Sequence, residues 1–290
     1  MSIIDLSNHQ GTIDWEQAQK LVDLAIIRTS RGTVLAEREC KSYVKGCKQY
    51  GIPFGHTHYS LYRNAKEALE EADRFISLID PEAKFLVVDV QDAVQKHTGV
   101  SFNTQIFIDH VQSSTGKRVG LFSNNYYYQL TGLARVKADF LWIARCSECG
   151  ENGRRPDVSC ELWQYTEEGT IPGCSCPVGL NALNGSWTLN DFIAPYRIGF
   201  AVAKGADTFR IQSGRYPTKK AMEKAMKRLL QEGYLHDAEG EPFCSTCVGW
   251  RFVSGTYDSQ AEAVEAATRA IQAGKLPYAT IKGTNESPVR

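Results

Sequence analysis

The segment 85–92, FLVVDVQD, constrains the fold of this chain more than any other stretch. Four apolar residues in a row, two of them β-branched, predict a strand that is buried on both faces. Proteins built on parallel barrels keep their functional residues at the carboxyl ends of such strands. Residues i and i+2 of a strand share a face, so Asp89 and Gln91 should face one space and Val90 the opposite side. The segment therefore predicts a barrel site with a carboxylate beside an amide.

Strand-like apolar runs recur along the first 190 residues, with amphipathic helical segments between several of them. We expect eight strands, at 3–6, 24–29, 53–59, 85–90, 119–123, 140–145, 160–166 and 178–181, and helices at 36–50, 65–78 and 103–114. Strands that alternate with helices favour a parallel sheet with right-handed crossovers. Eight units are many for so short a stretch, so the predicted fold is α/β, a flattened or partial (β/α)8-like barrel with shortened helices.

The sequence changes character after this region. Residues 185–206 show no clear periodicity and should connect two domains, with one short helix within 188–196. Beyond them, residues 209–233 align without gaps with residues 250–274, and each half predicts a strand, a Ser-Gly pair and a helix that ends at Gly. A further strand is expected after each half, which gives the β-α-β-β-α-β order of the ferredoxin-like plan. We therefore predict a barrel over 1–190, a linker over 191–205 and a small α+β domain over 206–290.

Charge divides the chain in the same way. Lys plus Arg and Asp plus Glu number 33 each, so the chain as a whole is not expected to bind nucleic acid. Residues 1–194 hold 19 basic and 23 acidic side chains, whereas residues 195–290 hold 14 and 10, which indicates two modules with different tasks. No apolar run approaches the length of a membrane span, and the first residues predict a strand and not a signal peptide.

Nine cysteines are many for a chain of this length, and an odd total excludes complete internal pairing. Structural zinc is one interpretation of the loop cysteines, with Cys146, Cys149, Cys160 and Cys174 as ligands. Their spacing, C-x2-C-x10-C-x13-C, matches no common zinc pattern. Reduced thiols with one or two disulfides are therefore favoured, and we predict no metal and no cofactor.

Polar and aromatic residues follow almost every strand predicted in the first domain. If the eight strands form a barrel, these residues converge at one mouth: Asp5, Tyr59, Asp89, Gln91, Ser123, Asn124, Trp142, Arg145, Gln164, Tyr165 and Asn181. Flat sugar faces stack on Trp and Tyr, and sugar hydroxyls exchange hydrogen bonds with Asp, Asn and Gln. The mouth is therefore predicted to bind carbohydrate. His56 and His58 could supply a proton there, although a histidine that only hydrogen-bonds at a strand end is more common.

The same region resembles a known family. The motifs are DxSxxxG from Asp5, IDW at 13–15, AIIR at 25–28, GIPFG at 51–55, VDV at 88–90, SN at 123–124, LWIAR at 141–145, WQY at 163–165 and LN at 180–181. In this order, over residues 1–190, the chain resembles glycoside hydrolase family 25, the lysozymes of phage endolysins and bacterial autolysins. The resemblance implies a flattened β/α barrel that cleaves the β-1,4 bond between N-acetylmuramic acid and N-acetylglucosamine in peptidoglycan.

Position by position, the resemblance implies a catalytic set that is incomplete here. Asp5 and Asp89 match active-site aspartates of the family, Gln91 stands in place of its catalytic glutamate, and Gly179 stands in place of a further aspartate. An amide cannot protonate the leaving oxygen, and such acid catalysis is worth about 10²–10⁴-fold in rate. Gln91 still fits the space and can hydrogen-bond sugar. Two interpretations stay open: a hydrolase with the catalytic set Asp5, Asp89 and Gln91, or a lectin-like protein that grips glycan without cleaving it.

The C-terminal repeat resembles a SPOR domain, a module that binds peptidoglycan glycan strands stripped of their stem peptides. The resemblance covers residues 205–285 and implies a wall-binding role for the strand residues Arg210, Gln212 and Arg251. A small domain that makes only dimer contacts is the alternative, and the oligomeric state stays open. Together the two resemblances predict a phage endolysin, made in a host cytoplasm without a signal peptide and acting on the bacterial cell wall.

Overall fold

The computed structural model describes residues 2–92, 99–146, 154–194, 208–213, 218–242, 250–273, 275–276 and 279–284. The chain divides into two compact units, one made of 1–108 with 117–195 and the other of 109–116 with 196–290. Within the described ranges, no helix combines the length and the apolar character needed to cross a bilayer. The domain limits set at 190 and 206 from the sequence stay a proposal.

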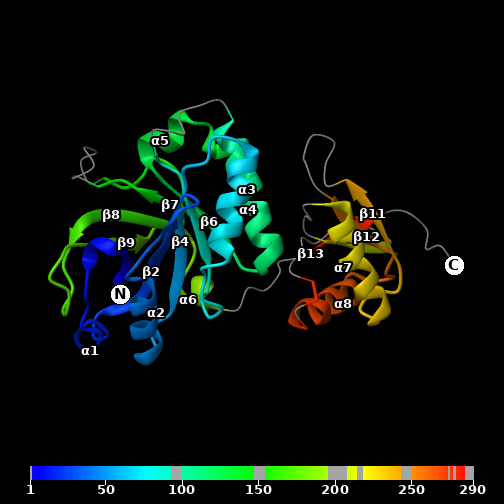
Figure 1. Cartoon of the computed structure of the whole chain (residues 1–290), viewed down its shortest axis with the longest axis horizontal. Coiled ribbons are helices and arrows are strands. Elements are labelled where there is room, and N and C mark those ends of the chain that lie inside the picture. Colours follow the sequence, from blue (N-terminus) through cyan, green and yellow to red (C-terminus); the bar gives the residue numbers. More distant parts are fainter. Residues whose placement is uncertain are drawn as a thin grey trace. The chain divides into compact units, whose positions relative to one another are not determined.

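Eight strands of the first unit close into a barrel (Figure 1). They are β1 (Ser2–Leu6), β2 (Val22–Arg31), β4 (Phe54–Tyr59), β5 (Leu86–Asp89), β6 (Val119–Asn124), β7 (Leu141–Ala144), β8 (Leu162–Gly169) and β9 (Val178–Leu183). Their order is β1-β9-β8-β7-β6-β5-β4-β2, and the parallel pair β1–β2 completes the ring. The short β3 (Leu35–Ala36) pairs with the end of β2. The α/β class predicted from the sequence is confirmed, and the barrel is complete.

One strand corrects the prediction of an all-parallel barrel. β9 runs antiparallel to both neighbours, with Asn181 opposite Gln164 on β8 and Gly179 opposite Asp5 on β1. Only residues 170–177 separate β8 from β9. A parallel neighbour needs a crossover of about a dozen residues or more, so this short connection favours an antiparallel pair. Gly179, near the start of β9, therefore lies beside Asp5 at the mouth.

Six α-helices lie among the described residues up to 194, and residues 109–115 of one of them, α4, fall in the second unit (Figure 1). They are α1 (Trp15–Ala18), α2 (Cys40–Gln49), α3 (Ala65–Ile76), α4 (Val100–Thr115), α5 (Asn125–Leu130) and α6 (Leu189–Ile193). The helix expected from residue 36 begins only at Cys40, because Leu35 and Ala36 belong to β3. The helix expected within 188–196 is α6, and Thr188 closes its start in a capping box.

Large aromatic side chains fill the amino end of the barrel. The ring of Phe192 on α6 packs against Phe85 and Phe140, with centroids 5.6 and 5.1 Å apart. Glycines make room for these rings: a Cβ at Gly55 would stand 2.4 Å from Phe85, and one at Gly120 would stand 2.3 Å from Phe140. Packing of this kind leaves space inside the barrel only toward the carboxyl ends of the strands.

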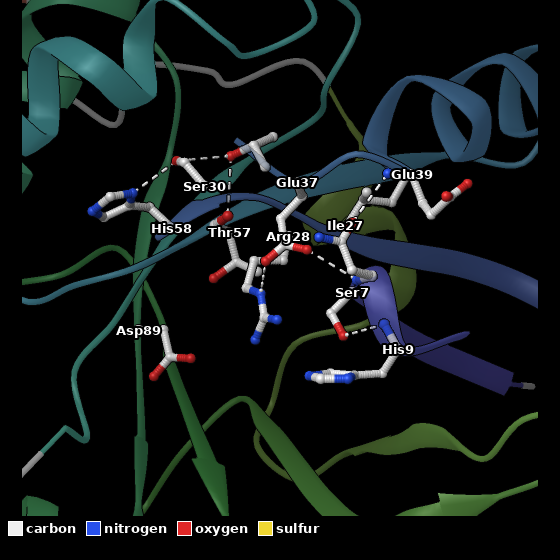
Figure 2. A network of polar contacts seen from close by, with 12 residues as sticks. Ser7, His9, Ile27, Arg28, Ser30, Glu37, Glu39, Thr57, His58 and Asp89 are labelled. Atoms are coloured by element: carbon white, nitrogen blue, oxygen red, sulfur yellow. Dashed lines mark hydrogen bonds and ion pairs between the residues drawn. The ribbon is translucent and has the colours of Figure 1, made fainter. Parts of the chain in front are cut away.

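A buried polar chain joins β2, β4 and α3. Ser30 Oγ lies 2.8 Å from His58 Nδ1 (Figure 2), and His58 Nε2 lies 2.8 Å from Glu71 Oε2. Burial lowers the pKa of His58, although Glu71 raises it, and a neutral ring can accept from Ser30 while donating to Glu71. Burial also lowers the pKa of His56 to about 4, and its Nδ1 lies 3.2 Å from the Ile27 carbonyl oxygen. Both histidines therefore serve in packing and hydrogen bonding.

Glu71→Ala is expected to lower the free energy of unfolding by about 3 kcal/mol. The change leaves the buried His58 ring without its acceptor and removes the carboxylate that accepts the backbone N–H of Leu61. Glu70→Ala on the same helix is the matched control, because its exposed pair with Lys66 contributes at most about 0.5 kcal/mol. Urea unfolding of the three proteins measures the difference, and equal losses in both variants would contradict the prediction.

The second unit follows the order predicted from the internal repeat. It contains β10 (Thr208–Ser213), α7 (Lys219–Gln231), β11 (Ala238–Pro242), β12 (Trp250–Ser254), α8 (Gln260–Gln272) and β13 (Ala279–Thr284). The four strands are antiparallel in the order β11-β12-β10-β13. Met222 and Leu229 of α7 and Ala267 of α8 pack against Ile211 and Phe252. Both helices thus cover one face of the sheet (Figure 1), and the alternate strand residues lie on the other face.

Candidate active site

A cavity of about 430 Å³ opens where the parallel strands of the barrel end. Its lining includes five residues predicted from the sequence: Asp5, Asp89, Gln91, Trp142 and Gln164. Asp89 and Gln91 both face it while Val90 between them is fully buried, as strand alternation predicts. The ends of β1 and β5, far apart in the sequence, therefore bring two carboxylates into one space.

Asp5 is a partly buried carboxylate held by two amide groups. Its Oδ2 accepts hydrogen bonds from Gln164 Nε2 and Asn181 Nδ2, each at 2.9 Å. Trp142 Nε1 donates to Asn181 Oδ1 at 2.7 Å, which fixes the direction of that amide. Burial raises the pKa of Asp5, whereas the two amide hydrogen bonds and Arg28 lower it. On balance the pKa of Asp5 is raised, and the two amides and Arg28 keep that rise smaller than burial alone would make it.

Asp89 has fewer donors around it. Its Oδ2 accepts one hydrogen bond, from Gln91 Nε2 at 3.2 Å, and its buried Oδ1 has no hydrogen-bond partner among the described residues. Burial raises the pKa of Asp89 well above its ordinary value, and the charges of Asp5 and Glu167 raise it further. Arg28 and Gln91 act in the opposite direction. The two carboxylates of the cavity thus sit in unequal environments.

Arg28 brings a positive charge to the cavity wall. Its Nε forms an ion pair of 2.6 Å with Glu37 Oε1, and Glu37 also accepts the backbone N–H of Asn8 at 2.9 Å. Figure 2 shows the guanidinium directed toward the same space as the Asp89 carboxylate and the His9 ring. Strand alternation from Ile26 could have placed Arg28 among the predicted site residues, because the two positions share a face.

Other cavity residues lie beyond the strand ends expected from the sequence. Glu167 lines the cavity because β8 continues further than predicted. His9 and Gln10 follow β1 in a single 3₁₀ turn, Asn8–Gln10, whose start is capped by Ser7. Ser7-x-x-Gln10 is a capping box, and this signal could have indicated that the chain turns at the mouth of the barrel.

Tyr59 does not line the cavity but forms a polar cluster outside it. Its hydroxyl donates to Asp92 Oδ2 at 3.0 Å, and the Arg31 guanidinium lies 4.8 Å from the centre of its ring. Burial raises the pKa of Tyr59 far above its ordinary value, and the charges of Asp89 and Asp92 contribute. The phenol is therefore neutral and available as a donor. Its predicted role in sugar binding stays a prediction.

The other predicted binding residues also lie outside the cavity lining. Asn124 caps α5 by accepting the backbone N–H of Tyr127 at 2.7 Å. Arg145 pairs with Asp157 at 2.8 Å, and the exposed Tyr165 packs edge-on against Trp163. Asn181 acts through Asp5, as described above. Of the residues predicted at the carboxyl ends of the strands, only part therefore lines the cavity.

The structure describes three of the four cysteines considered as zinc ligands. Cys146 is disulfide-bonded, Cys149 lies outside the described residues, and Cys160 is a buried thiol that accepts from Asn184 Nδ2 at 3.3 Å. Cys174 donates to the carbonyl of Cys176 at 3.3 Å. A disulfide sulfur is not a thiolate ligand. In the part of the chain that the structure describes, no three His, Cys, Asp or Glu side chains are grouped to hold a metal ion.

The raised pKa of Asp89 predicts a pH-dependent stability. A carboxyl with a higher pKa in the folded than in the unfolded state binds more protons when folded, so stability falls as pH rises between the two values. Asp89→Asn cannot ionise and is expected to be more stable than wild type at neutral pH, by about 1.4 kcal/mol for each unit of the pKa difference. Thermal unfolding of both proteins from pH 4 to pH 8 measures this, and parallel curves would contradict it.

The family model described as Glycosyl hydrolases family 25 matches residues 4–174. Among solved structures, the catalytic domain of endolysin ply40 from bacteriophage P40 of Listeria monocytogenes is 30% identical, with a TM-score of 0.59, over 63% of this chain and 92% of that chain. The spore cortex lytic enzyme SleM of Clostridium perfringens is 21% identical, with a TM-score of 0.59 and coverages of 72% and 80%. The bacterial lysozyme of Streptomyces coelicolor is 19% identical, with a TM-score of 0.56 and coverages of 67% and 95%. A search of curated protein sequences gave no match.

Proposed function

This chain belongs to glycosyl hydrolases family 25, and from that premise we propose that its barrel cavity cleaves the β-1,4 bond between N-acetylmuramic acid and N-acetylglucosamine, with Asp5 and Asp89 as the acting carboxylates. The chain is a glycoside hydrolase of the lysozyme type, and peptidoglycan is its substrate. One observation carries the choice of residues: two carboxylates from distant parts of the sequence, Asp89 buried and Asp5 partly buried, line the same cavity.

The cavity supplies what a glycosidase transition state requires. Positive charge develops on the sugar ring as the glycosidic bond breaks, and a carboxylate held in a dry site stabilises that charge. Asp5 fits this task because two amides hold it in place. Phe122 and Trp142 offer apolar surface to a sugar ring, and the amide of Gln91 offers hydrogen bonds to hydroxyls.

The glycine at position 179 fits this arrangement. A Cβ at Gly179 would stand 2.1 Å from Asp5 Oδ2, so the Asp5 carboxyl occupies the space that a side chain at 179 would need. Position 179 is therefore coupled to Asp5 by sterics. Restoring an aspartate there would displace Asp5, so Gly179→Asp is a poor way to ask whether the site works.

Release of reducing ends from purified bacterial cell walls tests the proposal. The full-length protein is expected to release them, and Asp5→Ala is expected to release almost none. Asp73→Asn, on the exposed face of α3, is the control variant and should release as many as wild type. The lectin-like alternative makes the opposite prediction. If wild type bound the walls but released no reducing ends, while Gln91→Glu did release them, the wild-type site would bind glycan without cleaving it.

We further infer that the face of the second unit's sheet opposite its two helices binds glycan strands of the wall. The three residues named by the SPOR resemblance lie on that face, where Arg251 Nη1 donates to Gln212 Oε1 at 3.4 Å and Arg210 pairs with Glu239 at 3.5 Å. Arg251 Nε also pairs with Glu241 at 2.5 Å. Arginines and an amide arranged on a sheet face suit the hydroxyls and carboxylates of a glycan.

Co-sedimentation with cell walls tests this second role in an Asp5→Ala background, where the wall stays intact. Arg251→Ala is expected to weaken binding about tenfold, whereas Lys224→Ala on the exposed side of α7 should not. The alternative role in dimer contact predicts a different result. In that case Arg251→Ala would change the mass measured by light scattering and leave wall binding as it was.

A further inference from the structure

We propose that Asp89 is the proton donor of this enzyme, a task that the amide at position 91 cannot perform. The inference rests on the hydrolase function proposed above and deepens it. It assigns the two carboxylates different tasks: Asp5 carries negative charge, and Asp89 carries the proton that the leaving oxygen receives.

The hydrogen bonds around the two carboxyls are unequal. Asp5 Oδ2 accepts two amide N–H groups at 2.9 Å, and donors of this kind stabilise a charged carboxylate. Asp89 accepts one longer bond, 3.2 Å from Gln91, and this bond falls on Oδ2. Its Oδ1 is buried and has no hydrogen-bond partner among the described residues. A buried carboxyl with so few donors is costly to ionise, and this cost favours the neutral acid at Asp89.

Three charges face Asp89 from different strands: Asp5 and Glu167 favour its neutral form, and Arg28, the strongest of the three, opposes it. Asp5 on β1 and Glu167 on β8 both line the cavity and repel a negative charge on Asp89. Arg28 on β2 attracts it, but that guanidinium is already paired at 2.6 Å with Glu37. Tyr59 on β4 is a neutral phenol, because burial raises its pKa. Burial itself adds the largest effect in the same direction.

Different environments for two neighbouring acids are the usual way in which an enzyme separates an acid from an anion. Gln91 then has a positioning role. By donating to Oδ2 it holds the orientation of the Asp89 carboxyl in the cavity. Asp89 and Gln91 face the same cavity. A proton donor at position 89 therefore lies in the same site as the family's glutamate, which would occupy position 91.

The reaction balances with water as the only co-reactant. The O–H bond of Asp89 breaks as its proton passes to the glycosidic oxygen. The bond between that oxygen and the sugar C1 breaks, and its electron pair stays on the oxygen. Water then supplies hydroxide to C1, and its remaining proton returns to the Asp89 carboxylate. The Asp5 carboxylate stabilises the positive charge on the sugar between these steps.

Two substrates distinguish the proton donor from a residue that only holds the sugar. Cell walls need a protonated leaving group, whereas a dinitrophenyl glycoside of the wall disaccharide does not, because dinitrophenolate leaves without help. Asp89→Asn is expected to lose about 10²–10⁴-fold on walls and less than about tenfold on the aryl glycoside. Wild type should also lose activity on walls as pH rises through the titration of Asp89, and this loss should be absent with the aryl glycoside. Asp5→Asn should lose activity on both substrates.

Each remaining outcome overturns the inference in a recognisable way. If wild type cleaves walls and Asp89→Asn loses equally on both substrates, or on neither, Asp89 is not the proton donor and the hydrolase function stands. If wild type cleaves neither substrate, the hydrolase function and the inference fail together. Asp73→Asn makes the same chemical change on an exposed helix face, and it shows whether the loss depends on position.

Discussion

Asp5→Asn is expected to reduce the hydrolysis of cell walls by about 10³-fold while the protein stays folded. The substitution keeps the shape of the side chain and removes its charge. Gln164 and Asn181 hold Asp5 at 2.9 Å each in the direction that a carboxylate requires, so the site is preorganised for a negative charge. Initial rates of reducing-end release, compared at equal wall binding, measure the effect.

Asp14→Asn is the matched control for this prediction. Asp14 is exposed and caps α1 by accepting the backbone N–H groups of Glu16 and Gln17, a task that Asn performs equally well. Its variant should therefore keep both stability and activity. A loss of less than tenfold in Asp5→Asn would show that the charge at position 5 matters little, and it would remove Asp5 from the catalytic set.

Gly179→Ala is expected to reduce activity about a hundredfold and to lower the free energy of unfolding by about 1–3 kcal/mol. The new Cβ would stand 2.1 Å from Asp5 Oδ2 and 2.5 Å from its Cγ. Asp5 and Gly179 are directly opposite in the pairing of β1 with β9, so the two backbones cannot separate without breaking the barrel. The carboxyl must therefore turn away from the two amides that hold it.

A double-mutant cycle isolates this clash. In an Asp5→Ala background the obstructing carboxyl is absent, so adding Gly179→Ala should cost little further stability. Thermal and urea unfolding of the four proteins give the interaction energy. If the two changes were additive, the proposed steric coupling would be wrong, and the loss in Gly179→Ala would arise from the strand itself.

The barrel could be predicted because its strands carry strong local signals. The run 85–88 is apolar and is followed by Asp89 and Gln91, so its burial and the face of each side chain follow from the pleat alone. The order of strands and helices in the second unit could be predicted from its repeat for a similar reason. Each half contains a complete strand and helix whose apolar stripe is visible in the sequence.

The direction of β9 could not be read in the same way. Periodicity reports which face of a strand is buried, and it carries no information on whether the neighbouring strand runs parallel or antiparallel. The importance of Gly179 was hidden for the same reason, because it depends on β9 lying opposite Asp5. For Arg28, the strand pattern predicts that it shares a face with Ile26. Its ion pair with Glu37 is a tertiary contact, which the pattern does not predict.

The position of α6 decides where this protein can be shortened. Its Phe192 closes the floor of the barrel against Phe85 and Phe140, and the Arg118 side chain donates to the carbonyl oxygen of Ala194 at 3.2 Å. A truncation after the last barrel strand would therefore remove the floor and expose both rings to water, even though every cavity residue would still be present. A stand-alone hydrolase should extend through Ala194, and a shorter one should aggregate on heating.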